Sequence, residues 1–400
     1  EAIDSGHMTS IPDPETLGRL RHEVERGLPG YLADLEAIVN IESGTYTKAG
    51  VDEVETWMAE RLSALGATIE RHPNEELGDT VVATFTRHEP GPTVMLVGHA
   101  DTVFDLGYLE RRPFEIRDDE ILGPGVSDMK SGLLVGLYAL RAIRALADDE
   151  WLPVGRLVYV VNPDEETGSP LSRPLIAELA KSADAAFVME GARENGDIVS
   201  ARKGMMHIRA TLRGRSAHAG VEPQKGRSAT LEAAHKTVAL HALNGRWPGV
   251  TVNVGELRGG TRPNIVAEDC VITIDMRARL RSEQDEAEAA IYGILESSTV
   301  PDITTEIERL VHSRPMEKTE ASAVLVDAAM AIAAELGFEL ADAETGGGSD
   351  ANTTAGAGVP SLDGLGPVGG NDHTPSEYIE KSSIVPRTTL LAGLLLSVEG

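Results

Sequence analysis

Short apolar runs typical of strands alternate with helical segments in the first half of the chain. The strand-like runs lie at residues 80–86, 93–97, 156–161 and 185–189, and helical segments lie at 132–147 and 172–180. Asp13 and Pro14 open an earlier helix, as its N-cap and its first residue. Because strands that alternate with helices pair in parallel, we expect an α/β fold whose mixed, largely parallel sheet is flanked by helices.

From about residue 204 the pattern changes to strands with a period of two, interleaved with helices at 228–243 and 283–297. The order strand, helix, strand, strand, helix, strand predicts a compact α+β, ferredoxin-like insertion. We therefore expect a catalytic domain in two segments, 11–203 and 314–400, interrupted by a smaller domain at 204–313. Residues 1–10 are typical of an expression-tag remnant.

Charge and cysteine content exclude several classes of function. The chain has 36 Lys and Arg against 64 Asp and Glu, a net charge of −28, which would repel nucleic acids and anionic lipids. No apolar run reaches the roughly 18 residues of a membrane span. With Cys270 as the one cysteine, a metal would be held by His and carboxylate side chains. We expect a cytoplasmic protein, or a periplasmic or secreted one if a signal peptide was removed.

Polar residues follow several of the apolar runs, at the strand ends where open α/β sheets bind ligands. His99 and Asp101 fit a metal-binding imidazole whose second ring nitrogen is held by a carboxylate, although such a pair also serves as a loop cap. Asp128 lies between glycines and a helix, where its two oxygens could bridge two cations. The alternative is that Asp128 is the N-cap of that helix.

Three consecutive acids, residues 164–166, follow the strand at 156–161 and repel one another unless a cation is present. Because successive side chains of extended backbone point in opposite directions, Glu166 or Glu165 can bind metal while the other faces the substrate as a base. A solvated acidic turn is the alternative. With Glu190 and His373, the set has the donors for a hydrolytic two-metal site that shares Asp128.

Eight ordered motifs carry a family resemblance: HADTVF, GPGVSDMKSG, NPDEETGS, MEG, RSAHAG, NIV, TGGGSDAN and DHTPSEY. Together they resemble the di-zinc metallopeptidase family of glutamate carboxypeptidases, aminoacylases, acetylornithine deacetylases and succinyl-diaminopimelate desuccinylases. The resemblance implies two Zn²⁺ per subunit, with Co²⁺ or Mn²⁺ fitting the same donors. The ligands it implies are His99, Asp128, Glu166, Glu190 and His373. Asp128 would bridge the ions, Asp101 would orient His99, and Glu165 would act as general base.

The resemblance also implies that the inserted domain forms a homodimer, in which His218 reaches the neighbouring subunit's active site. His218 as an ordinary loop histidine is the alternative. Glu190 points to the glutamate carboxypeptidase subgroup, in which Asn264 and Arg277 would hold the free carboxylate of the substrate. Gly347 and Gly348 would approach the same carboxylate with their backbone N–H groups. Arg277 as a surface strand residue remains the other interpretation.

Specificity for the leaving amino acid rests on fewer residues. Arg314 matches an arginine that glutamate-specific relatives use for the side-chain carboxylate. Asp197 occupies the place of an expected lysine, for which Arg202 and Lys203 are candidate substitutes, and an aromatic or aliphatic C-terminal residue is the alternative to glutamate. The predicted activity is a zinc carboxypeptidase that releases a C-terminal amino acid, glutamate favoured, from peptides or N-acyl amino acids by a metal-bridging hydroxide. The alternatives are an aminoacylase or N-acyl-amino-acid deacetylase, and an inactive zinc-binding dimerisation protein.

Overall fold

The structure, a computed structural model, describes residues 10–147 and 151–398. The predicted tag remnant lies outside these residues except for Ser10. The chain divides into two compact units. The first comprises the described residues up to Ser200, Lys318–Thr345 and the residues from Ser349 on, and the second comprises Ala201–Glu317 and Gly346–Gly348. The expected insertion at 204–313 lies within the second unit.

The helices predicted at 132–147, 172–180, 228–243 and 283–297 are present within about two residues of the predicted bounds. The α-helices of the described part of the chain are α1 (Pro14–Val39), α2 (Lys48–Ala64), α3 (Ser131–Leu146), α4 (Arg173–Ala180), α5 (Ala229–His241), α6 (Arg281–Glu296), α7 (Glu320–Leu336), α8 (Asp350–Gly356) and α9 (Ile384–Ser397). The predicted N-cap of α1 is confirmed, because the Asp13 carboxylate accepts the Thr16 backbone N–H at 2.7 Å.

The first unit is built on a six-stranded sheet in the order β1-β2-β6-β3-β7-β14. Its strands are β1 (Thr68–His72), β2 (Thr80–Thr86), β3 (Thr93–His99), β6 (Arg156–Asn162), β7 (Ala185–Val188) and β14 (Ser361–Leu362). The strands β6, β3, β7 and β14 pair in parallel, whereas β1 and β2 are antiparallel to their neighbours. The prediction of a mixed, largely parallel sheet is therefore confirmed.

Two smaller sheets contain the strands that do not belong to the six-stranded sheet or to the sheet of the second unit. One is four-stranded, in the order β15-β16-β5-β4, and the other pairs β13 with β8. Their bounds are β4 (Glu115–Arg117), β5 (Glu120–Leu122), β8 (Ile198–Arg202), β13 (Asp342–Thr345), β15 (Gly369–Gly370) and β16 (Tyr378–Glu380).

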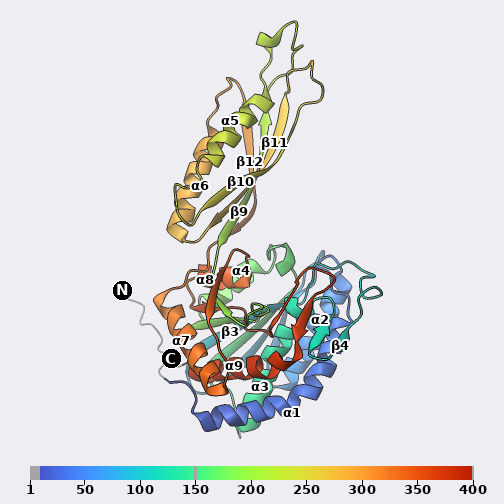
Figure 1. Cartoon of the computed structure of the whole chain (residues 1–400), viewed down its shortest axis with the longest axis vertical. Helices are drawn as coiled ribbons and strands as arrows, with labels where there is room; N and C mark the ends of the chain where they lie inside the picture. Colours follow the sequence, from blue (N-terminus) through green and yellow to red (C-terminus); the bar gives the residue numbers. More distant parts are fainter. Residues whose placement is uncertain (1–9, 148–150, 399–400) are drawn as a thin grey trace. The chain divides into compact units, whose positions relative to one another are not determined.

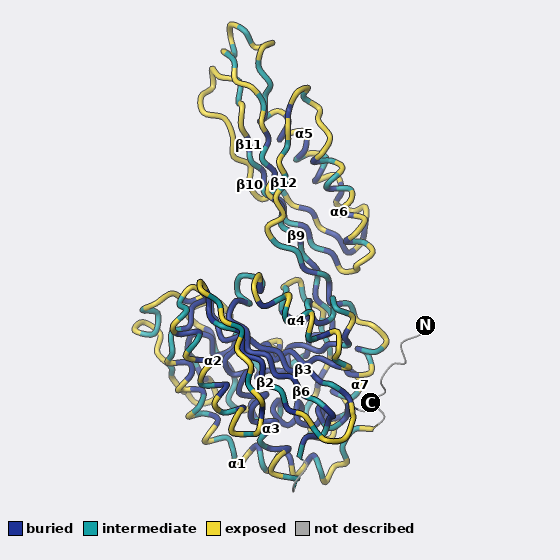
Figure 2. The backbone as a smooth tube through the Cα atoms, turned by 180° about the vertical axis from the view of Figure 1, so that it is seen from behind, coloured by how far each residue is buried: buried dark blue, intermediate teal, exposed yellow. Residues whose placement is uncertain are grey.

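Helices cover both faces of the central sheet, as the alternation of strands and helices predicts. Alternate residues of β2, β3 and β6 belong to one large core cluster with α1, α2, α3, α7 and α9. The helices α4 and α8 pack on each other on the opposite side, and α8 contacts β7 and β14 (Figure 1). The central strands are consequently buried on both faces, whereas the outer helix surfaces are exposed (Figure 2).

The carboxyl ends of three neighbouring strands meet at one edge of this sheet. The strand β3 lies between β6 and β7 and is parallel to both, with His99 opposite Asn162. Just beyond β7, the Met189 N–H donates to the Val97 carbonyl at 3.1 Å. The residues that follow these strands are therefore brought to a common place.

The second unit is a four-stranded antiparallel sheet with two helices. Its strands are β9 (Gly204–Arg213), β10 (Thr251–Gly259), β11 (Asp269–Ala278) and β12 (Thr304–Ser313), in the order β10-β11-β9-β12. Alternate residues of β9 and β11 are buried in a separate core with α5 and α6. The predicted ferredoxin-like α+β unit is thus present.

Candidate metal centre

All five predicted metal ligands lie in the first unit, at strand ends or in the turns and loops between elements. His99 is the last residue of β3, and Glu190 comes two residues after β7. Glu166 lies in the turn that follows β6, and His373 lies in the loop between β15 and β16. Asp128 belongs to the irregular turn Val126–Lys130, which leads into α3.

The Asp128 carboxylate joins the two histidines. Its Oδ1 lies 3.0 Å from His99 Nε2, and its Oδ2 lies 3.0 Å from His373 Nε2. Each histidine has a further carboxylate near the same ring nitrogen: Glu190 is 3.7 Å from His99, and Glu166 is 3.1 Å from His373. One carboxylate between two imidazoles, each with its own second acid, is an arrangement suited to a pair of cations.

The alternative role of Asp128 as a helix N-cap is wrong in this structure. The helix α3 begins at Ser131, its N-cap position is taken by Lys130, and no side-chain capping hydrogen bond is formed. Instead, the backbone of the Asp128 turn is held by Glu377, a buried residue. The Glu377 carboxylate accepts the N–H groups of Gly125 at 3.2 Å, Ser127 at 2.8 Å and Asp128 at 3.1 Å. Sequence reasoning missed Glu377, although it lies in the same motif as His373.

Asp101 is fully buried and contacts more than the histidine it was expected to orient. Its carbonyl oxygen accepts from His99 Nδ1 at 2.9 Å, and its carboxylate lies 3.3 Å from the same nitrogen. The carboxylate also accepts the backbone N–H groups of Glu165 at 3.2 Å and Glu166 at 3.3 Å. Thr45, which the sequence did not single out, donates its hydroxyl to Asp101 at 2.7 Å. Asp101 thus links β3 to the acidic turn.

The three consecutive acids have different surroundings. Asp164 turns away from the cluster, because its carboxylate accepts the Leu171 N–H at 2.6 Å and the Ser172 hydroxyl at 2.5 Å. Glu165 and Glu166 remain with the cluster. His99, Glu165 and Glu190 form one group whose ligand atoms all lie within 4.8 Å of one another, and His99, Asp128 and Glu166 form a second. The solvated-turn alternative therefore does not describe Glu165 and Glu166.

Electrostatics mark the cluster as one that requires positive charge. Burial, together with the charge of Asp128, raises the pKa of Glu190 to about 8. Burial and the charge of Glu190 raise the pKa of Glu165 well above its usual range. The pKa of His373 rises to about 11 through its hydrogen bonds to Asp128 and Glu166. Carboxyls with raised pKa values beside histidines with raised pKa values are typical of a cluster of acids that binds cations.

The donor set fits divalent metal ions. Two imidazoles and three carboxylates supply only nitrogen and oxygen ligands, which zinc and its neighbours in the first transition row accept. The Glu166 Oε1 atom is buried and has no hydrogen-bond partner. Because a buried carboxylate oxygen without a partner is costly, this atom is best explained as a ligand position.

The predicted substrate-binding residues lie in the second unit. His218 and Asn264 are both exposed and lie on neighbouring loops, joined by a hydrogen bond from the Ala219 N–H to the Asn264 carbonyl at 3.0 Å. His218 Nδ1 accepts the Gly220 N–H at 3.2 Å. Within this unit the structure thus brings His218 and Asn264 together, and their roles remain predictions.

Arg277 projects from β11 and is held on two sides. Its Nε donates to Asp275 at 2.9 Å, and its Nη1 donates to the Gly346 carbonyl at 3.4 Å, next to Gly347 and Gly348. Arginine and glycine loop are therefore adjacent, as the resemblance implies.

Arg314 is engaged elsewhere in the second unit. Its guanidinium pairs with Asp285 of α6 and donates to Gln284 at 3.2 Å. Lys203 lies between β8 and β9. The parts of Arg314 and Lys203 in substrate specificity therefore also remain predictions.

Comparisons with known proteins agree with this fold and site. The chain matches the model of peptidase family M20/M25/M40 over residues 95–397. It is 29% identical to carboxypeptidase G2 of Pseudomonas sp. (strain RS-16) over 376 residues, which cover 92% of this chain and 89% of that protein. It is 28% identical to the acetylornithine deacetylase of Edwardsiella ictaluri over 270 residues, covering 62% and 68% of the two chains. The crystal structure of aminopeptidase PepT from Bacillus cereus superposes with a TM-score of 0.76 at 23% identity, covering 93% of this chain and 98% of that one.

The fold and the carboxylate–histidine cluster define a metal-dependent hydrolase of the peptidase and amidohydrolase type. The family match extends over well more than half of the chain, so this protein belongs to peptidase family M20/M25/M40. The resemblance drawn from the eight motifs is confirmed, as is the prediction that the protein is an enzyme. Within the described residues, no helix combines the length and the apolar character that crossing a membrane requires.

Proposed function

We propose that this enzyme binds two zinc ions and hydrolyses the amide bond that precedes a C-terminal amino acid, with glutamate favoured as the leaving residue. The observation that carries the proposal is Asp128 between His99 and His373, each with its own additional carboxylate. The carboxypeptidase assignment is supported by similarity to carboxypeptidase G2 along nearly the whole chain, whereas similarity to acetylornithine deacetylase is shorter.

The ions would be held by His99, Asp128, Glu166, Glu190 and His373. When bound, divalent cations acidify water and stabilise developing negative charge on an oxygen. Glu165 is the residue that would carry the proton. One of its carboxylate oxygens lies within 4.8 Å of ligand atoms of His99 and Glu190. Its backbone N–H is held by the Asp101 carboxylate. Glu165 would take the proton of the attacking water and deliver it to the departing amine.

The substitution Glu165→Gln tests this role. We expect kcat to fall by about 10²–10⁴, the range of general acid–base catalysis, while two zinc ions per chain are retained. Glu178→Gln, on the exposed surface of α4, is the matched control and should keep full activity. A loss below about tenfold in the zinc-loaded enzyme would remove Glu165 from the mechanism.

Substrate class is tested by changing only the end of the substrate. A peptide or N-acyl amino acid ending in glutamate should be hydrolysed, and its C-terminal carboxamide should react at least about tenfold more slowly, because Arg277 would lose a charge-assisted bond to the carboxylate. Equal rates for the two would contradict a carboxypeptidase. A panel of acetyl, benzoyl and peptidyl derivatives of glutamate, leucine and phenylalanine separates the carboxypeptidase from the aminoacylase alternative.

We also propose a homodimer in which His218 completes the partner's active site. The exposed apolar side chains Leu231 and Val238 of α5 support association through the second unit. In a mixture of His218→Ala and Glu165→Gln proteins, a heterodimer would contain one site with both residues intact. Activity above that of either variant alone is the expected result, and no gain after subunit exchange would contradict the shared site.

A further inference from the structure

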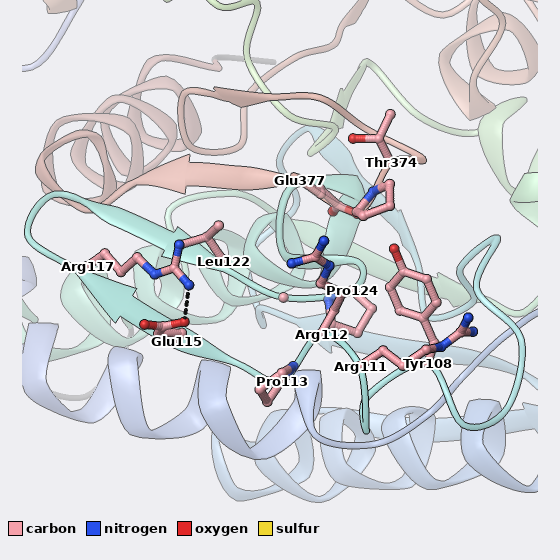
Figure 3. A pocket seen from close by; sticks show the side chains of 12 residues that line it. Tyr108, Arg111, Arg112, Pro113, Glu115, Arg117, Leu122, Pro124, Thr374 and Glu377 are labelled. Atoms are coloured by element: carbon pink, nitrogen blue, oxygen red, sulfur yellow. Dashed lines mark hydrogen bonds and ion pairs between the residues drawn. The ribbon is translucent and has the colours of Figure 1, made fainter.

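The first unit contains a concave site outside the cluster of proposed metal ligands, and the proposed hydrolysis does not use it. It is a cavity of about 130 Å³ in the loop region before β4 and β5 (Figure 3). By the same measure a single water needs about 10–15 Å³, so the cavity has room for a polyatomic ligand. Its polar walls come from Tyr108, Thr374, three arginines and two acids, namely Arg111, Arg112, Arg117, Glu115 and Glu377.

Two of the three arginines carry charge that the described part of the chain does not neutralise. Arg117 is paired with Glu115 at 2.6 Å. In contrast, the guanidinium of Arg112 makes no hydrogen bond or ion pair with any described residue, and that of Arg111 only lies over the Tyr108 ring at 5.4 Å. Arg111 and Arg112 are consecutive residues, so in a chain with a net charge of −28 this segment carries a local excess of positive charge.

The backbone fixes both arginines at the rim of this cavity. Their N–H groups both donate to the Tyr108 carbonyl at 3.0 Å, which closes a tight turn. The Tyr108 hydroxyl is buried but has no hydrogen-bond partner, so a donor without an acceptor faces the same place. Figure 3 shows the Arg112 guanidinium and the Tyr108 ring on the side of the cavity that faces Thr374 and Glu377.

The remaining acid of the wall does not neutralise these donors. Glu377 lines the cavity, but its carboxylate already accepts three backbone N–H groups of the Asp128 turn. We propose that the Arg111–Arg112 cavity binds a small oxyanion, either inorganic phosphate or the carboxylate of a small acid. A guanidinium fork and a phenolic donor match the oxygens of both. This inference depends on neither the proposed substrate nor the metals.

The test is a calorimetric titration of the full-length, metal-loaded protein with inorganic phosphate at low ionic strength, and a parallel titration with acetate. We expect saturable binding of one anion per chain. The substitution Arg112→Ala should weaken it at least about tenfold, since a charge-assisted contact is lost. Arg19→Ala, which removes an exposed arginine of α1, should leave it unchanged. The anion that binds more tightly shows whether the cavity prefers phosphate or a carboxylate.

Phosphate could also bind at the metal centre, so the titration is repeated after the metals have been removed with a chelator. Retained binding in the metal-free protein assigns the anion to the Arg111–Arg112 cavity, and loss of binding overturns the proposal. Tyr108→Phe, which removes one hydroxyl and keeps the ring, should weaken binding severalfold. The proposal is also overturned if Arg112→Ala binds the anion as tightly as the unaltered protein does. It is equally overturned if neither phosphate nor acetate saturates the protein by about 10 mM.

Discussion

Asp101 is the residue through which a strand end and an acidic turn are aligned. Its carboxylate accepts from the Thr45 hydroxyl and from the N–H groups of Glu165 and Glu166, and its carbonyl holds His99. An amide in place of the carboxylate would set an NH₂ group against at least one of these N–H donors. A single atom exchange would therefore disturb both a proposed metal ligand and the proposed base.

We expect Asp101→Asn to lower kcat and zinc affinity by about 10–100-fold each, the usual effect of altering a group that orients metal ligands. Steady-state kinetics at saturating zinc and a competitive zinc titration measure the two effects. Asp105→Asn, exposed on the following loop, is the control and should change neither. An Asp101→Asn enzyme with unaltered kcat and zinc affinity would show that the carboxylate is dispensable.

Glu55 on α2 is a buried acid outside the metal centre, and neither of its carboxylate oxygens has a hydrogen-bond partner. Burial, with the charges of Asp52 and Asp79, raises its pKa to about 10. The folded state therefore keeps a proton that the unfolded chain releases above a pKa of about 4.3. Stability must fall as pH rises between these two values, because the folded state binds more protons.

Glu55→Gln removes this titration. Relative to the variant, the unaltered protein should lose up to about 1.4 kcal/mol of unfolding free energy per pH unit between pH 6 and 8. Urea unfolding at pH 6, 7 and 8 measures the difference. Glu53→Gln, two residues away and exposed, should leave the pH dependence as it is. Parallel pH profiles for Glu55→Gln and the unaltered protein would mean that Glu55 is ionised in the fold.

At the scale of elements, the start of α3 lies directly against the end of β7. A Cβ atom at Gly132 would be 1.8 Å from the Met189 carbonyl oxygen, so only glycine permits this approach. The helix follows the Asp128 turn, and the strand end precedes Glu190. The contact between the two elements therefore sets the separation of two proposed metal ligands.

Gly132→Ala should cost about 1–3 kcal/mol of stability, because the helix must move away from backbone atoms that cannot yield. Zinc affinity should fall with it. Gly18→Ala in α1 meets no atom within 4 Å and should stabilise the protein by about 0.5–1 kcal/mol. Urea unfolding and zinc titration of both variants measure these effects. Equal stability and equal zinc affinity of Gly132→Ala and Gly18→Ala would contradict the prediction.

At the scale of the whole molecule, the proposed metal ligands all belong to the first unit, and the second unit has its own core. A ligand that binds only folded protein stabilises the region it binds. Zinc removal should therefore accelerate amide exchange in β3, β6 and β7 and leave β9 and β11 unchanged. Hydrogen exchange of the full-length protein with and without chelator measures this, and equal acceleration in both units would show that the units unfold together.

Local sequence determined most elements of this protein. The Asp13-Pro14 signal placed the start of α1, and the period of apolar residues placed β2, β3 and β6 within a residue or two of their observed bounds. These are short-range effects of capping and burial, and they need no knowledge of the remaining chain. Three of the five proposed metal ligands, His99, Glu166 and Glu190, also stood out because each follows an apolar run, whereas Asp128 and His373 were recognised through the motifs that carry the family resemblance.

Only the tertiary structure decided which groups support that centre. Glu377 holds the Asp128 turn across 249 positions of sequence, and Thr45 reaches Asp101 across 56. The local sequence around either residue does not predict such a contact, because a hydrogen bond between distant segments depends on how the sheet and its loops pack. Likewise, only packing shows that Asp128 does not cap α3 and that its two oxygens face His99 and His373.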